Sequence, residues 1–196
     1  MSEVYYERPN LYIGFHGCDK KRGLKLIEKP YTIPQSTHDY EWLGYGFYVW
    51  ENNKDRALDW AQSHHPKFEE PFVIGVVYTL GNCLDLTDQH FIELLSEDFP
   101  MFIEDFKSSK SELPQNTDLK GNPDPEGVLR KLDCALIEHL HSIFESAGNN
   151  NRFDTVRCSF TEGKPAYPGT AIRDKNHIQV CIRNTDCIKG FFLPRT

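Results

Sequence analysis

The chain has 196 residues, of which 39% are hydrophobic and 26% are charged, a balance typical of a globular protein with a sizeable core. Its formal net charge of −7 argues against a general nucleic-acid-binding surface. No apolar run approaches the roughly 20 residues that cross a bilayer, and the N-terminus lacks the blocks of a secretory signal, so we expect a cytoplasmic protein with no membrane partner.

The cysteines and histidines do not indicate a disulfide framework or a metal site. Six cysteines are scattered without a Cys-x-x-Cys pair, which favours free thiols in a cytosolic protein. The pairs His64-His65 and His139-x-His141 fall on expected helices, where residues one or two positions apart do not share a face. We therefore expect no bound metal.

The first elements in chain order are a strand and a helix. The apolar run 11–16 predicts a strand that ends at His16, and Gly17 is expected to open a turn. A short helix is expected over residues 20–28. Prolines then bracket a loop that runs to about residue 42.

The strongest pattern in the chain follows this loop. Gly44-x-Gly46 predicts a tight turn, and the aromatic residues after it predict a strand over residues 47–50. An asparagine, Asn52 or Asn53, is placed to cap a helix. The same pattern also fits an ordinary strand–turn–helix unit with its aromatics in the core.

The rest of the chain predicts strands on both sides of a helical stretch. The expected elements are strands over 72–80 and 83–86, helix from 87 to about 107 with a break near Pro100, an exposed loop over 108–126, a helix over 126–146, and strands over 155–160, 178–183 and 188–193. The predicted fold class is α+β, as a single domain over residues 1–196 with a helical insertion at about 86–150.

The strand near the C-terminus has one polar position that stands out. Side chains alternate across a sheet, so Ile178, Val180 and Ile182 are expected to point into the core. Gln179 then points the other way, outward or into a cleft.

Three motifs together resemble the ADP-ribosyltransferase superfamily, in the His-Tyr-Glu branch of diphtheria toxin and the poly-ADP-ribose polymerases. They are Phe15-His16-Gly17 at the end of an apolar strand, Gly44-Tyr-Gly-Phe-Tyr48 before a helix, and Gln179 on the last major strand. They occur in the order of that family and span both ends of the chain. The resemblance implies a split β-sheet core and NAD as co-substrate.

The resemblance also implies a role for each residue. His16 would hydrogen-bond the adenosine ribose of NAD, and backbone groups of Gly17 would hold the nicotinamide carboxamide. Tyr48 would stack on the cationic nicotinamide ring, with Trp60 on its other face. The residue at position 179 would hold the ribose 2′-hydroxyl while positive charge develops on the sugar.

Gln179 is the main departure from the family pattern. A glutamate at this position supplies a negative charge beside the developing cation, whereas a glutamine can only form hydrogen bonds. Three carboxylates, Glu41, Glu51 and Glu162, are candidates for a substitute, although nothing in the sequence places them at the site.

The loop before the last major strand occupies the position from which members of this family commonly contact the acceptor, so the resemblance makes it a candidate acceptor-binding element. Residues 152–196 carry a net charge of +4, and the loop contributes Lys164, Tyr167, Arg173 and Lys175. Such a loop suits a phosphate-bearing or acidic acceptor, nucleic acid included. An ordinary solvated loop fits the same residues equally well.

The function implied by the resemblance is that of a mono-ADP-ribosyltransferase. It would move ADP-ribose from NAD to a macromolecular acceptor, a protein or a nucleic acid, as a bacterial toxin or phage-defence effector with an antitoxin as a further candidate partner. Two alternatives stay open at this point: a non-catalytic module that binds NAD or ADP-ribose, and an NAD glycohydrolase in which water replaces the acceptor.

Overall fold

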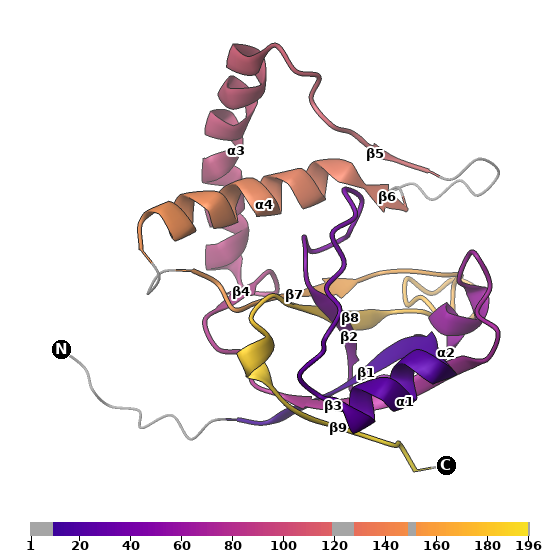
Figure 1. Cartoon of the computed structure of the whole chain (residues 1–196). Coiled ribbons are helices and arrows are strands. Elements are labelled where there is room, and N and C mark those ends of the chain that lie inside the picture. Colours follow the sequence, from indigo (N-terminus) through magenta and orange to yellow (C-terminus); the bar gives the residue numbers. More distant parts are fainter. Residues whose placement is uncertain (1–9, 119–127, 149–151, 196) are drawn as a thin grey trace.

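The computed structural model describes residues 10–118, 128–148 and 152–195, and within them the chain is a mixed α+β structure built on one large, mostly antiparallel sheet (Figure 1). The helices are α1 (Lys20–Glu28), α2 (Lys54–Ser63), α3 (Gln89–Ser109) and α4 (Lys131–Ser146). The strands of the large sheet are β1 (Tyr12–Asp19), β2 (Phe47–Glu51), β3 (Pro71–Tyr78), β4 (Cys83–Asp85), β7 (Thr155–Phe160), β8 (His177–Ile182) and β9 (Ile188–Phe192).

The large sheet consists of two well-paired halves that meet at a short junction. Its strand order is β4-β7-β8-β2-β1-β3-β9, and only β4 and β7 run parallel. Strand β1 pairs with β3 from Tyr12 to Asp19, and β2 pairs with β8 from Phe47 to Trp50. Strands β1 and β2 are paired at only two positions, Gly14 with Glu51 and Phe15 with Trp50. The two halves therefore separate beyond Phe15.

Helices cover both faces of the sheet. Phe47 and Val49 point to the face that carries α1, where they pack with Leu26 of that helix. The alternate residues of β2 point to the opposite face: Tyr48 packs in the cluster that contains α4, and Trp50 packs in the cluster that contains α2. Figure 1 shows α3 and α4 together above the sheet, with α1 and α2 at its lower right. The boundary between the α4 and α2 clusters thus crosses β2 between Tyr48 and Trp50.

Most predicted elements are confirmed, but the first strand does not end at His16. Strand β1 continues to Asp19, and Gly17 pairs with Val73 instead of opening a turn. The absence of a side chain at Gly17 is required here because a Cβ atom would collide with the Ala57 carbonyl of α2. Glycine at this position allows α2 to pack closely on β1. From the sequence alone, a glycine needed for such a contact looks the same as a glycine that opens a turn.

Helix α3 runs without a break through Pro100, where the sequence predicts one. Proline removes a backbone hydrogen bond, which destabilises an isolated helix. Contacts with α4 on both sides of the proline stabilise this one: Asp98 and Asp105 both hydrogen-bond the imidazole of His139, at 2.8 and 3.1 Å. Tertiary packing therefore outweighs the local preference.

The stretch predicted as a loop over residues 108–126 contains part of a second, small sheet. Strand β5 (Asn116–Thr117) pairs with β6 (Leu129–Arg130), and α4 begins at Lys131 instead of residue 126. The Asn116 side chain also accepts a hydrogen bond from the backbone N–H of Leu132 at 2.9 Å and so caps α4 from outside the helix. The remainder of the predicted loop, residues 119–127, lies outside the described residues.

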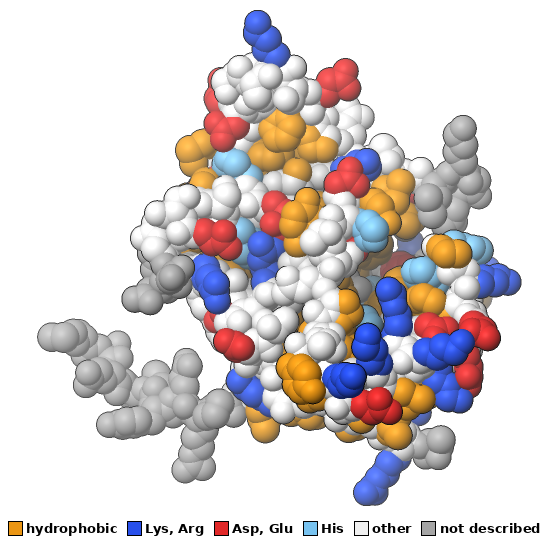
Figure 2. Space-filling model, viewed as in Figure 1, with side chains coloured by type: hydrophobic (Ala, Val, Ile, Leu, Met, Phe, Trp, Pro, Cys, Tyr) orange, Lys and Arg blue, Asp and Glu red, His pale blue; other side chains and the backbone are white. Residues whose placement is uncertain are grey.

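Two further expectations concern the whole chain. None of the helices in the described ranges combines the length and the apolar character needed to cross a membrane. All six cysteines are free thiols, and four of them are buried. On the side of the molecule that faces the viewer in Figure 2, basic and acidic side chains are intermingled around α1 and α2.

Candidate functional site

His16 lies where the two halves of the sheet separate. Its Nδ1 atom is 2.8 Å from the backbone oxygen of Tyr48. A carbonyl oxygen only accepts, so Nδ1 carries the proton and Nε2 holds a free lone pair. The imidazole thus replaces a hydrogen bond of the β1–β2 ladder and fixes its own tautomer. Its ring also stacks on Phe47, with a centroid separation of 4.3 Å.

The environment keeps the His16 ring uncharged at neutral pH. Burial lowers its pKa from 6.5 to about 4, and the hydrogen bond with the Tyr48 carbonyl only partly opposes this effect. No described residue forms a hydrogen bond with Nε2. This atom is therefore suited to accept a hydrogen bond from a hydroxyl group of a ligand.

Tyr48 is attached to the turn that precedes its own strand. Its hydroxyl donates to the Gly44 carbonyl at 2.6 Å and accepts from the Leu43 N–H at 2.9 Å. Burial raises the pKa of the phenol well above its usual value. The hydroxyl is consequently a neutral structural group, and the face of the ring is what remains for contact with a ligand.

Gln179 lies beside Trp50 on the adjacent strands β8 and β2. The residue is only 9% exposed, and none of the residues that the structure describes hydrogen-bonds its side-chain amide. The indole Nε1 of Trp50, in contrast to the Gln179 amide, is fully buried and has no hydrogen-bond partner among the described residues. Buried polar groups are normally paired, so this part of the sheet has spare hydrogen-bonding capacity.

Gly17 and Trp60 come together across the β1–α2 contact. A Cβ atom at Gly17 would lie 3.2 Å from the Trp60 ring. Trp60 also packs against Trp50, with ring centroids 5.5 Å apart, and against His64 at 4.9 Å. The predicted cofactor residues Gly17 and Trp60 are therefore neighbours, and Trp50 links them to Gln179.

The structure brings the three predicted catalytic residues onto adjacent strands but does not join their side chains. The His16 ring contacts the backbone of Tyr48 and stacks on Phe47, which belongs to the α1 face of the sheet. Tyr48 and Gln179 point to the opposite face. A ligand that touches all three has to enter the gap between β1 and β2.

The candidate carboxylates occupy three different places. Glu51 forms a two-point ion pair with Arg157, at 2.8 and 2.9 Å, and its charge is therefore already neutralised. Glu41 accepts a hydrogen bond from the Ser36 hydroxyl, and burial raises its pKa. Glu162 lies just after β7, and its carbonyl accepts a hydrogen bond from the Lys175 N–H, which continues the β7–β8 pairing by one step. In this register Glu162 is on the same side of the sheet as Gln179.

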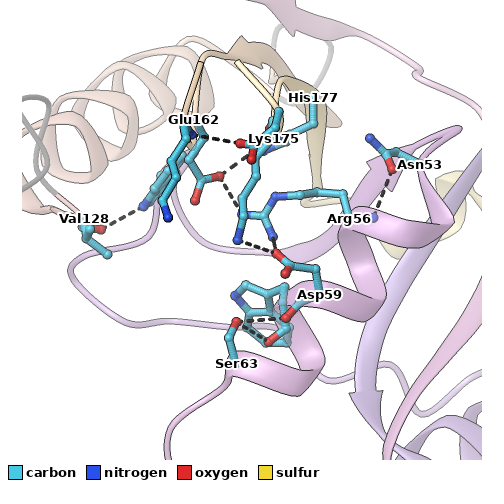
Figure 3. A network of polar contacts seen from close by, with 12 residues as sticks. Asn53, Arg56, Asp59, Ser63, Val128, Glu162, Lys175 and His177 are labelled. Carbon is cyan, nitrogen blue, oxygen red and sulfur yellow. Dashed lines mark hydrogen bonds and ion pairs between the residues drawn. The ribbon is translucent and has the colours of Figure 1, made fainter. Parts of the chain in front are cut away.

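Glu162 belongs to an ion-pair network between α2 and the acceptor-binding candidate loop (Figure 3). Arg56 of α2 reaches Glu162 at 2.5 Å and Asp59 at 3.1 Å, and Lys175 reaches the same Asp59 carboxylate at 2.9 Å. His177 lies 3.7 Å from Glu162, and burial lowers its pKa. These contacts fasten the loop to α2.

The loop itself is a small hairpin-like arm. Ala166 and Ile172 form a backbone hydrogen bond of 2.9 Å, and Tyr167 near the tip is 58% exposed. Among the predicted acceptor-binding residues, Lys175 forms an ion pair with Asp59. The side chains of Lys164 and Arg173 form no hydrogen bond or ion pair with any described residue. The sequence does not distinguish these two environments, because the ion pairs join residues more than 100 positions apart.

Sequence reasoning missed the pair formed by Glu138 and Arg183. Glu138 lies on α4 and contacts the Gly44–Gly46 turn, and Arg183 follows directly after β8. Nothing in the local sequence of either residue identifies the pair, because it exists only once α4 has packed against β2 and β8. No cluster of His, Cys, Asp and Glu side chains suited to a metal ion occurs within the described ranges.

Comparisons with known protein families, with curated proteins and with solved structures found no match for this chain.

Proposed function

We propose that the protein is a mono-ADP-ribosyltransferase that moves ADP-ribose from NAD to a macromolecular acceptor, a protein or a nucleic acid. The observation that carries this proposal is the separation of β1 from β2 at His16. Tyr48 lies on β2, next to β1 in the sheet, and Gln179 lies on β8, the neighbour of β2. A split sheet with these residue types is what the resemblance to the His-Tyr-Glu branch implies.

Two unpaired polar groups support NAD as the ligand. The Nε2 lone pair of His16 suits a ribose hydroxyl, and the Gln179 amide suits the 2′-hydroxyl of the second ribose. The aromatic faces of Tyr48 and Trp60 suit the cationic nicotinamide ring. The two riboses of the dinucleotide would thus be held by His16 Nε2 and the Gln179 amide, which have no hydrogen-bond partner among the described residues.

The proposed reaction breaks the bond between nicotinamide and ribose C1′. The bonding electron pair leaves with nicotinamide, positive charge develops on the ribose, and an acceptor atom bonds to C1′ as it loses its proton. Gln179 orients the sugar but contributes no negative charge. We therefore propose slow transfer of single ADP-ribose units rather than chain elongation, consistent with a toxin or phage-defence effector that an antitoxin restrains.

Incubation of the full-length protein with NAD carrying a labelled adenylate group, in the presence of separate protein, DNA and RNA pools, tests the proposal. We expect free nicotinamide and label on one of the pools. Nicotinamide release without labelling of any pool would instead identify an NAD glycohydrolase. Binding of NAD without nicotinamide release would identify a non-catalytic module.

Variants of Tyr48 test the role of its ring. Tyr48→Ala removes the stacking face, and we expect nicotinamide release to fall by about 100-fold or more. Tyr48→Phe keeps the ring and loses only the hydroxyl contacts with the turn, so it is the matched control: its loss should appear as a higher KM for NAD and should be much smaller than that of Tyr48→Ala. Full activity of Tyr48→Ala would refute the proposed role.

A further inference from the structure

The Gly44–Gly46 turn is held by a carboxylate from α4. Glu138 Oε1 accepts a hydrogen bond from the Tyr45 N–H at 2.7 Å. Gly44 has a φ angle of +76°, and a Cβ atom at this position would collide with the same carboxylate oxygen. Glycine is therefore required at position 44 both for its backbone conformation and for the close approach of Glu138.

Arg183 completes the contact from the end of β8. Its guanidinium group forms a two-point ion pair with Glu138, and its Nη1 atom also donates to the Tyr45 carbonyl at 3.1 Å. Burial opposes the charge of Arg183, but the hydrogen bonds with Glu138 raise its pKa above the usual value. Both backbone polar groups of Tyr45 are thus bound by a partly buried, charged pair.

The same turn determines where the Tyr48 ring lies. The Tyr48 hydroxyl is bonded to Gly44 and Leu43, so any movement of the turn moves the phenol with it. Ile137, next to Glu138 on α4, packs in the same apolar cluster as Leu43 and Tyr48. Helix α4 therefore contacts the turn through a charged pair and the ring through apolar packing.

We propose that Glu138 is a positioning residue for NAD binding, a role that rests on the function proposed above. Through Arg183 and the Tyr45 backbone it connects the helical segment, the end of the strand that carries Gln179, and the turn that holds Tyr48. In this proposal the helical segment predicted as an insertion helps to hold the site in place, through Glu138 of α4. Glu138 touches neither NAD nor the acceptor in this scheme.

Steady-state kinetics and amide exchange of the full-length protein test this role. In Glu138→Ala the KM for NAD should rise about tenfold while kcat changes by less than about threefold, because the loss concerns orientation of the binding face. Hydrogen exchange at the Tyr45 amide, followed by NMR, should become faster. In Glu138→Gln the amide oxygen still accepts from Tyr45 and Arg183, and KM should stay within about threefold of the wild-type value.

Glu145→Ala is the matched control, because Glu145 is an exposed carboxylate on the same helix that forms no hydrogen bond with the turn. An unchanged KM in Glu138→Ala would overturn the positioning role, as would an equal increase in Glu145→Ala. A rise in Tyr45 exchange together with an absence of NAD binding by the wild-type protein would show that Glu138 holds the turn but that the proposed function, and the role in NAD binding with it, is wrong.

Discussion

At the scale of single residues, the separation of two strands determines the chemical state of His16. Strand β2 pairs with β1 only at Trp50 and Glu51, so the carbonyl of Tyr48 has no backbone partner on β1. It is bound by the His16 imidazole instead. The hydrogen bond places the proton on Nδ1, and burial keeps the ring neutral. The sequence identified His16 as a candidate from its position before a glycine, but its tautomer depends on a backbone atom 32 residues away.

The lowered pKa of His16 predicts a loss of stability on acidification. Protonation favours the unfolded state when the folded-state pKa is lower, so this contribution is fully present above pH 6.5 and is lost as the pH falls towards about 4. The change from 6.5 to about 4 corresponds to roughly 3 kcal/mol in the free energy of unfolding. Urea unfolding between pH 7 and pH 4 measures it.

The comparison variant is His16→Asn, which keeps a donor for the Tyr48 carbonyl but does not titrate. Its stability should depend less steeply on pH across this range than that of the wild-type protein. His90→Asn changes an exposed histidine and should follow the wild-type curve. Identical pH dependence of the wild-type protein and His16→Asn would contradict the buried, neutral state of this ring.

At the scale of elements, local patterns predicted the helices and strands well where side-chain periodicity decides the structure. The apolar run of β3 and the Asn53 cap of α2 appear as expected. Ile178, Val180 and Ile182 of β8 face the core as predicted, but the opposite face of β8 is buried as well. The failures occur where a distant element decides. Gly17 continues a strand because β3 pairs with it, and α3 continues through Pro100 because α4 packs against it.

Because α2 packs closely on β1, adding a single methyl group at Gly17 should destabilise the protein strongly. Gly17→Ala places a Cβ atom against the Ala57 carbonyl and the Trp60 ring, neither of which can move without displacing α2. We expect a loss of about 1–3 kcal/mol in the free energy of unfolding and weaker binding of NAD. Thermal unfolding and NAD titration measure the two effects.

Gly190→Ala in β9 is the control, because a Cβ atom there meets no atom within 4 Å. It should have little effect on either quantity. If Gly17→Ala were as stable as Gly190→Ala, the close packing of α2 on β1 would not be present in solution.

At the scale of the whole molecule, the sequence predicted the α+β class correctly. It proposed the residues of the candidate site, but not how these residues are arranged in space. Each motif was recognisable locally, whereas the strand order β8-β2-β1 that makes the three motifs neighbours is a long-range property. The contribution of α4 through Glu138 was equally hidden, because Glu138 and Tyr45 are 93 residues apart. Pairings over such distances leave no periodic signal in the chain.

The central claim is that NAD binds at the gap between β1 and β2. Titration of the isotope-labelled protein with NAD, followed by the chemical shifts of its backbone amides, tests this claim directly. We expect the largest changes at Gly17, Tyr48 and Gln179 and at their strand neighbours. An absence of shift changes at millimolar NAD, or changes confined to parts of the molecule remote from β1, β2 and β8, would contradict the account.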